Sequence, residues 1–560
     1  MKRLLRACQE SPAQAVCLAL LVLLVAGLIV YPLGLILVHS FQAEGGGAGL
    51  APYRELLANR DVGAAAKMSS WLMLDVAIDC LALGVPLAWL VARTDMPGKV
   101  WVQGAAAIAF VIPSFINVIS WIFLFAPNSG YLNKALAAVL HLEAAPFNIF
   151  SFGGLVFIEV CHLFPIVFFA VSTALANADA SHEQAARILG AGRLRTMLTI
   201  TLPLVAPAIV SSVVLCVLDA LSSFGAPAAI GTMANFKVVS TQIYQLVTFP
   251  PKLPLAAALS VPVAAWTLAL LGLQHLFLRK NRFTTLTGKS SAPERVELGA
   301  LRWPLAALVA AALFCIAVLP LLGLVALSLL KVFGAELVAQ NFALTHYRAV
   351  FDSSFTVLPA VKNSLVLATA AASVCVLAGL LLAWFIERIA FAGRGVAVGV
   401  VSVAFGIPSI ILGIGVLLAY IGPLYGTLTI VLVAYCARHL PIAFVYTRAL
   451  VKQLSPELEE AARVSGASWA RTLRDISFPV MRPGAFVAWL LIFSLCLREQ
   501  PMSAILTQGD TGVMSTTVLQ FIEDGSIEVA AAVAVLIVAV SMACLLVPRL
   551  LGMRTKGATT

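Results

Sequence analysis

The chain has 560 residues, of which 61% are hydrophobic and only 11% are charged. A soluble globular chain has about 25% charged residues, so this composition excludes an ordinary soluble protein and indicates a membrane protein. The net charge of +10 could suggest a nucleic-acid partner, but most lysines and arginines lie in the loops expected on the cytoplasmic side. That asymmetry follows the positive-inside rule, which predicts two cytoplasmic termini and no binding of nucleic acid.

Runs of roughly 20 apolar residues recur along the chain, and each is long enough for a membrane-spanning helix. Helices are expected because lipid offers no partner for unpaired backbone groups, so the predicted fold class is an all-α polytopic membrane protein. Twelve spans are predicted, near residues 15–38, 69–92, 100–125, 151–176, 205–224, 255–278, 303–329, 362–386, 396–421, 427–450, 483–502 and 527–548. The first span is interpreted as a membrane anchor, because its apolar run is too long for a signal peptide. Pro113 and Pro408 are expected to kink the third span of each half.

The second half of the chain repeats landmarks of the first. Phe110–Ser114 is echoed by Phe405–Ser409, 295 residues later (408 − 113), and His162–Pro165 is echoed by Arg438–Pro441, 276 residues later (441 − 165). The spacing changes because the first half has a longer outer loop, near 126–150. Two halves of six spans each enter the membrane in the same orientation, which predicts parallel repeats. The expected units are a first half over 1–278, a cytoplasmic linker over 279–301 and a second half over 302–560.

A polar decapeptide occurs once in each half. Glu183–Gly192 reads EQAARILGAG and Glu459–Ser468 reads EEAARVSGAS, 276 positions apart (459 − 183). Each copy lies between the fourth and fifth predicted spans of its half, within the segments 181–203 and 455–479. The residues predict a capped helix, a turn at glycine and a second short segment that ends at proline. Matched spacing at matched positions indicates a docking element rather than an ordinary connector.

These two loops resemble the EAA loop of binding-protein-dependent ABC importer permeases, and the resemblance extends over both halves. It implies the type I ABC importer permease fold and a chain that forms a solute pathway, is not an enzyme and binds no cofactor itself. The implied partners are two copies of a cytoplasmic ABC ATPase that carry ATP and Mg, and a periplasmic solute-binding protein, at a bacterial inner membrane. The residues implied to couple the chain to the ATPases are Glu183, Gln184, Ala185, Ala186, Gly190 and Pro203 in the first loop, and Glu460, Ala461, Ala462, Gly466 and Pro479 in the second.

One position departs from the family pattern. The glutamate of the motif corresponds to Glu460 in the second loop but to Gln184 in the first, and Glu183 lies one position earlier. The two ATPase contacts could therefore differ in strength. The chain itself is not expected to bind ATP, because the segment Gly288–Ser290 has Phe283 where a P-loop needs glycine.

Five carboxylates within or beside predicted spans are candidates for the solute pathway: Asp75, Asp79, Glu159, Asp219 and Glu499. Asp75 and Asp79 lie at i and i+4 on one helix face. Each costs about 2.5–3.5 kcal/mol at mid-membrane on insertion scales, so both should face protein or water. They could line the pathway or pair with polar groups of neighbouring helices, and the sequence favours pairing. Whether any of the five contacts a metal ion is left open.

The leading hypothesis is an importer permease for ferric iron. Ser222–Gly231 resembles a stretch in fused permeases for ferric iron and thiamine. Leu497–Pro501 resembles the L-x-E-L-P segment of ferric-iron permeases, with Gln500 in place of the usual leucine. Related permeases for 2-aminoethylphosphonate or polyamines remain alternatives. A secondary transporter with parallel halves would need no matched docking loops, and a polytopic membrane enzyme lacks a convincing nucleophile–base pair here.

Overall fold

The structure is a computed structural model that describes residues 12–42, 47–178, 181–248, 250–280, 295–352, 357–389 and 393–550. Most of these residues are helical, and extended pairing among them is limited to three isolated β-bridges. The prediction of an all-α membrane fold is therefore confirmed.

The first half contains short and long helices, including two π-helical turns, η1 and η2. In chain order its elements are α2 (Pro12–Val25), η1 (Ala26–Val30), α3 (Tyr31–His39), α4 (Ala51–Ala58), α5 (Arg60–Arg93), α6 (Lys99–Val111), α7 (Ser114–Phe125), α8 (Tyr131–Leu140), α9 (Phe152–Asn177), α10 (Ser181–Ile188), α11 (Arg193–Thr196), η2 (Met197–Thr201), α12 (Leu202–Ser222), α13 (Gly225–Ala234), α14 (Val239–Val247) and α15 (Leu253–Lys280).

The second half follows the same order, with π-helical turns η4 and η6 and three short 3₁₀ turns, η3, η5 and η7. Its elements are η3 (Gly299–Leu301), α16 (Arg302–Leu313), η4 (Phe314–Val318), α17 (Leu319–Leu329), η5 (Ala339–Asn341), α18 (Thr345–Phe351), α19 (Val357–Arg388), α20 (Arg394–Gly406), α21 (Ser409–Leu424), α22 (Leu428–Gln453), α23 (Pro456–Val464), α24 (Trp469–Thr472), η6 (Leu473–Ser477), α25 (Phe478–Leu497), α26 (Pro501–Leu506), η7 (Gly509–Thr511), α27 (Met514–Glu523) and α28 (Ile527–Leu550).

Two spans are sharply broken. Over the described residues, ten helical segments are long and apolar enough to cross a membrane, and two bent pairs raise the number to twelve. The pair α6 and α7 is bent by 102° and the pair α20 and α21 by 112°. Each break lies at an Ile-Pro step, because proline has no N–H to donate and disfavours a helical residue before it. The expected kinks at Pro113 and Pro408 are therefore confirmed.

The two halves pack their central helices in the same way. In the first half α5 packs on α9 and both contact α12, and in the second half α19 packs on α22 and both contact α25. Gly84 and Gly379, 295 positions apart (379 − 84), lie where these helices approach most closely. A Cβ on Gly84 would lie 2.8 Å from the Cβ of Val167, and one on Gly379 would lie 3.1 Å from the backbone nitrogen of Phe444. Small residues at such crossings let two membrane helices pack backbone to backbone.

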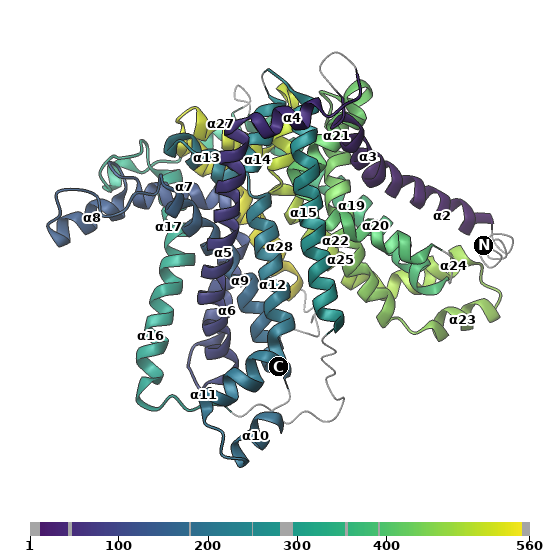
Figure 1. Cartoon of the computed structure of the whole chain (residues 1–560), viewed down its shortest axis with the longest axis horizontal. Coiled ribbons are helices and arrows are strands. Elements are labelled where there is room, and N and C mark those ends of the chain that lie inside the picture. The colour runs from purple at the N-terminus through teal and green to yellow at the C-terminus, as the bar shows by residue number, and fades with distance from the viewer. Residues whose placement is uncertain are drawn as a thin grey trace.

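The first span of each half packs against the opposite half. The helix α3 contacts α21, and α17 contacts α7; in Figure 1, α2 and α3 lie beside the second half and α16 and α17 beside α6. The hydroxyl of Tyr420 donates to the carbonyl of Gly27 at 2.9 Å, inside the π-helical turn η1. The two halves are therefore interlocked rather than merely adjacent.

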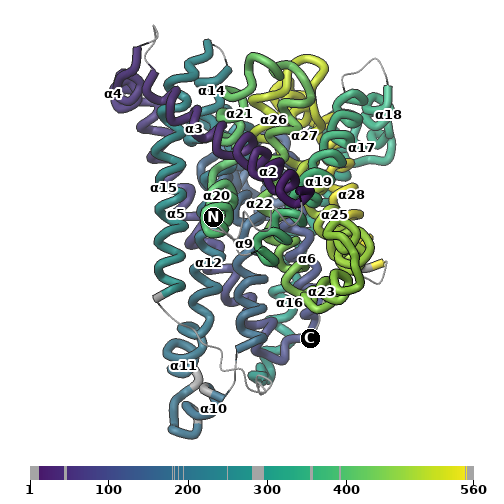
Figure 2. Tube along the Cα trace, turned by 90° about the vertical axis from the view of Figure 1, so that its right-hand side faces the viewer, coloured from purple at the N-terminus to yellow at the C-terminus, as the bar shows by residue number. Residues whose placement is uncertain are grey.

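The elements between spans collect at opposite ends of the bundle. In Figures 1 and 2, α4, α14 and α27 lie at one end, and α10 and α11 lie at the other; α23 is in the lower half of both views. The long outer loop predicted near 126–150 contains α8, which projects sideways at the left of Figure 1. The repeated polar loops, which contain α10 and α23, thus lie away from the end that contains α4, α14 and α27.

Two predicted regions are only partly described. Residues 281–294 of the expected linker and both chain termini lie outside the described residues. The end of the linker pairs with the segment after α5: Val296 forms a β-bridge with Thr94, and the amide of Leu298 donates to the Asp95 carboxylate at 3.0 Å. The junction between halves is therefore anchored where α5 ends.

The eleventh span ends earlier than predicted. It was expected over 483–502, but α25 ends at Leu497, and Arg498 to Gln500 form a non-helical step before Pro501 opens α26. The charged pair Arg498 and Glu499 therefore lies at a helix end and not within a helix.

Replacing Gly84 by valine should destabilise the bundle by about 1–3 kcal/mol, because the added carbons overlap Val167 and overpacking carries costs of that size. The measurement is the thermal unfolding midpoint in detergent. Gly104→Val is the control, since a Cβ on Gly104 in α6 meets nothing within 4 Å. Equal midpoints for the two variants would contradict the close α5–α9 crossing.

Candidate coupling loops and polar interior

The repeated polar loops have the same local structure. Each has a short helix, α10 or α23, then a turn, a single helical turn in α11 or α24, and a π-helical turn that leads into a span. The π turns η2 and η6 begin 276 positions apart (473 − 197), as the loops do. Ser455 caps α23 by accepting a hydrogen bond from the amide of Glu457. The predicted helix–turn–helix is present in both halves.

Glycine makes the turn at the end of each short helix. Gly190 and Gly466 both have φ of 83°, a left-handed conformation that glycine adopts without strain. The following amides, of Ala191 and Ala467, donate to the carbonyls of Ala186 and Ala462 at 2.9 and 3.0 Å. This i to i−5 bond is the Schellman motif that ends helices with glycine.

The predicted coupling residues separate onto two faces. Gln184 and Glu460 occupy matched positions, and both are exposed. Their neighbours Glu183 and Ala462 are buried, with 8% and 8% of their surface exposed. Pro203 and Pro479 are exposed at the first turn of α12 and α25. The side available to a partner therefore carries Gln184 in one loop and Glu460 in the other, so Glu183 does not stand in for Glu460.

Large apolar side chains are exposed at the tips of both loops. Ile188 and Leu189 are each 86% exposed and Val464 is 90% exposed, and Ile188 and Val464 are repeat-matched (464 − 188 = 276). Such apolar groups on an otherwise polar helix indicate an interaction surface. The first loop has leucine where the second has Ser465.

The glutamate just before the motif position is buried and hydrogen-bonded in each half. Glu183 accepts from the hydroxyl of Thr201 at 2.8 Å and from Arg93 at 3.3 Å. Glu459 accepts from the hydroxyl of Ser477 at 2.7 Å and from the Nε of Arg388 at 3.0 Å. The indole of Trp384 adds a third donor to Glu459 at 3.1 Å. Each short helix is therefore tied to two spans of its own half.

Arginines satisfy the backbone at both broken spans. Arg438 donates to the carbonyls of Phe405 and Ile407 at 3.3 and 3.0 Å. Arg498, from the second half, donates to the carbonyls of Phe110 and Val111 at 3.3 and 3.4 Å in the first half. Carbonyls freed at a break inside a membrane bundle need donors from the protein, so these arginines have a structural role.

The interior carboxylates lie close to these breaks. Glu159 is 1% exposed and accepts from the hydroxyl of Ser223 at 2.6 Å. Glu499 is 8% exposed, and one of its carboxylate oxygens lies 4.0 Å from the Nε2 of His439. Asp219 is exposed on α12. Two of the five predicted pathway carboxylates are therefore buried beside the interface of the halves, and Asp219 is accessible.

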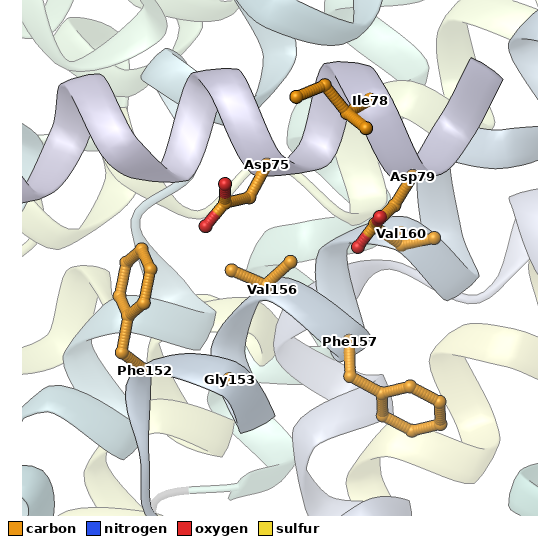
Figure 3. Close-up of a pocket in the computed structure, with 8 residues that line it drawn as sticks. All are labelled: Asp75, Ile78, Asp79, Phe152, Gly153, Val156, Phe157 and Val160. Carbon is orange, nitrogen blue, oxygen red and sulfur yellow. The ribbon is translucent and has the colours of Figure 1, made fainter. Parts of the chain in front are cut away.

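Asp75 and Asp79 line a separate pocket of about 300 Å³. Figure 3 shows both carboxylates on α5, facing Phe152 and Val156 of α9. Neither has a hydrogen bond or ion pair with another residue that the structure describes, so the favoured interpretation, pairing with polar groups between helices, is not what the structure shows. Neither Glu159 nor Glu499 lines this pocket.

The described part of the chain holds no group of three or more His, Cys, Asp or Glu side chains that could hold a metal ion. Its cysteines are free thiols. The interior therefore offers scattered oxygen ligands rather than a preformed cage.

The family comparison agrees with this geometry. The model of the binding-protein-dependent transport system inner membrane component matches residues 84–283 and 375–554, one copy per half. The chain belongs to this family. It is the permease subunit of an ATP-binding-cassette importer, with multiple spans in an inner membrane, and ATP hydrolysis is performed by a separate subunit. The two matched segments include both repeated polar loops.

Relatives of the permease differ in their solutes. It is 25% identical to the ferric transport system permease protein FbpB of Actinobacillus pleuropneumoniae, over 83% of this chain and 67% of that one. It is 27% identical to the putative 2-aminoethylphosphonate transport system permease protein PhnU of Salmonella typhi, over 38% of this chain and 74% of that one. It is 32% identical to the molybdenum transport system permease protein ModB of Escherichia coli, over 30% of this chain and 73% of that one.

Sequence reasoning missed the partners of the buried glutamates. Arg93 and Arg388 are 295 positions apart (388 − 93), and Thr201 and Ser477 are 276 apart (477 − 201), the spacings of the repeat itself. A position-by-position comparison of the halves could have found them. Glu459 was passed over because the family motif draws attention to Glu460.

Replacing Gly466 by alanine should loosen the end of α23, because a left-handed backbone costs about 1–2 kcal/mol for a residue with a Cβ. The amides of Gly466 and Ala467, which donate to Arg463 and Ala462, should then exchange hydrogen faster. Hydrogen–deuterium exchange on peptides covering 456–477 is the measurement. Gly422→Ala, at a helical position with open space around it, should leave this exchange unchanged; unchanged exchange in Gly466→Ala would disprove the turn.

Proposed function

We propose that this permease carries ferric iron inward across a bacterial inner membrane, with one ATPase docked on each of its two loops. A periplasmic binding protein would deliver the iron to the outer face. Closure of the ATPases would shift the bundle between outward-open and inward-open states, because the closed ATPases would bind one of these states more tightly than the other. Both chain termini would lie in the cytoplasm.

The observation that carries the docking proposal is the pair of matched, exposed tips. Ile188 and Val464 are the same element of the repeat, and each is at least 86% exposed. A surface helix gains nothing in water from such a side chain, whereas an apolar groove on a partner would bury it. Two tips on one chain support two ATPase contacts. The side chains beside them differ, Gln184 against Glu460 and Leu189 against Ser465, so the contacts need not be equally strong.

The interior is compatible with a hard cation as cargo. Glu159 and Glu499 offer carboxylate oxygens, the ligands that hard cations prefer. They approach no third carboxylate or histidine closely enough, among the residues described, to form a cage. A pathway must bind its ion weakly enough to release it, so scattered ligands suit transport better than storage. A relative that matches 83% of the chain is named for ferric transport, which supports the same solute.

Other solutes remain candidates on specific grounds. PhnU and ModB match 38% and 30% of the chain and are named for 2-aminoethylphosphonate and molybdenum. Thiamine and polyamines, suggested by the resemblance of the sequence to fused permeases, belong to the same set. In all of these the machinery of the loops would be shared and only the cargo would differ.

Expressed with its neighbouring ATPase and binding protein in a host that lacks its own iron importers, the permease should restore growth on ferric citrate and uptake of radioactive iron. Uptake should be lost when the ATPase cannot hydrolyse ATP. The same cells should show no gain in uptake of molybdate or 2-aminoethylphosphonate.

A separate experiment, co-purification of the ATPase with the permease, tests the docking proposal. The ATPase should co-purify with the permease at two copies per chain, and the variants Ile188→Asp and Val464→Asp should each remove one copy. Val332→Asp, at a 61% exposed valine in the loop after α17, is the matched control. Retention of both copies by the double loop variant would refute docking on the tips, whatever the solute.

A further inference from the structure

Two buried carboxylates connect the docking helices to the spans. Glu183 lies in the first turn of α10 and Glu459 in the first turn of α23, each one residue before the exposed motif position. Their side chains are 11% and 6% exposed, and those of their arginine partners, Arg93 and Arg388, are 3% and 14% exposed. These ion pairs are therefore shielded from water, unlike surface pairs that contribute little.

The same three elements meet at each glutamate. The arginine is the last residue of the second span, since α5 ends at Arg93 and α19 ends at Arg388. The hydroxyl is the last residue of the π-helical turn before the fifth span, Thr201 in η2 and Ser477 in η6. Second span, short helix and fifth span are thus joined at one point in both halves.

The duplication preserves the same three groups, although the arginine donates through Nη1 of Arg93 and through Nε of Arg388. The hydroxyl donates to Oε1 of the glutamate in both halves, and the arginine donates to Oε2 in both. Neighbouring positions have not kept this correspondence, since Gln184 matches Glu460 and Leu189 matches Ser465. An ordinary connector needs no such network, whereas a joint that transmits force does.

The contacts of α5 with α10 and of α19 with α23 show how the second span is linked to the docking helix. The fifth span continues directly from the docking loop through η2 or η6, so it moves with the loop by covalent connection. The second span does not, because α9 or α22 intervenes in the chain. At the docking helix, the second span is linked by the arginine–glutamate pair and, in the second half, also by the indole of Trp384, which donates to Glu459. Arg388 also donates to the carbonyls of Val451 and Leu454 at the end of the fourth span, at 3.2 and 2.7 Å.

We propose that Glu183 and Glu459 are positioning residues that make the second and fifth spans of each half move with the docking helix when an ATPase displaces it. This inference rests on the proposed docking of ATPases at these loops and adds the route by which their motion enters the bundle. The charged pair holds the second span, and the hydroxyl of Thr201 or Ser477 fixes the carboxylate between the two spans. Removing the charge takes the carboxylate away from a buried arginine and uncouples the second span.

The test follows hydrogen exchange in the permease–ATPase complex in nanodiscs, with and without ATP, using an ATPase variant that binds ATP but does not hydrolyse it. In the unmodified complex, ATP should change exchange in peptides from α10, α5 and α12. In Glu183→Gln the response of α10 should remain and that of α5 should be lost. Glu459→Gln should give the same loss in α19. No transported solute is needed for this measurement.

A milder pair of variants provides the control. Thr201→Val keeps the volume but removes the hydroxyl that Glu183 accepts from, and it should weaken the α5 response. Thr199→Val makes the same change two residues away, where the exposed hydroxyl donates to the carbonyl of Arg195, and it should behave as the unmodified chain. This pair decides the matter if Glu183→Gln does not fold.

The outcomes separate the two proposals. If the unmodified permease retains no ATPase, the docking proposal itself fails. If the ATPase is retained, α10 responds to ATP, and α5 responds equally in Glu183→Gln, Thr201→Val and Thr199→Val, then docking stands and the positioning role is refuted.

Discussion

A helix break inside a membrane bundle leaves carbonyls that lipid cannot hydrogen-bond, and the rest of this structure follows from how those carbonyls are satisfied. Both third spans break at an Ile-Pro step, and a single arginine reaches each break. In the second half the arginine, Arg438, comes from the same half. In the first half it is Arg498, which comes from the other half, so one break is completed across the interface. Both arginines are therefore part of the scaffold.

The duplication explains which features are under shared constraint and which are free to change. The crossing glycines, Gly84 and Gly379, and the turn glycines, Gly190 and Gly466, are kept at matched positions because backbone geometry demands them. The polar interior has diverged: Glu159 corresponds to Tyr435, and Ser223 corresponds to Glu499 (435 − 159 and 499 − 223, both 276). Each half thus keeps one buried carboxylate near the interface but supplies it from a different element. The polar interior is asymmetric although the bundle around it is nearly two-fold.

The sequence predicted the number of spans, the repeat and the shape of the docking loops, because these depend on hydropathy, spacing and glycine, which are local. It also located both helix breaks, since proline acts on its own neighbours. It misjudged Asp75 and Asp79, because whether a mid-span carboxylate meets a polar group depends on the packing of distant helices. It did not find the contacts of Glu459, because Arg388 and Ser477 lie far from it in the chain and neither belongs to the motif. The end of the eleventh span was missed by a few residues because Arg498 leaves the helix to reach a carbonyl in the other half.

The exchanged first spans have a consequence for how the chain is made. When the ribosome has finished the first half, the surface of α7 that α17 will cover is still bare, and α3 has no α21 to rest on. Neither half is a finished bundle during synthesis, so membrane insertion must tolerate an open intermediate until residues beyond 300 arrive. Joining the halves in one polypeptide keeps the missing piece at high local concentration and guarantees equal numbers of each half. Fusion therefore solves an assembly problem that two separately translated subunits would have to solve by diffusion in the bilayer.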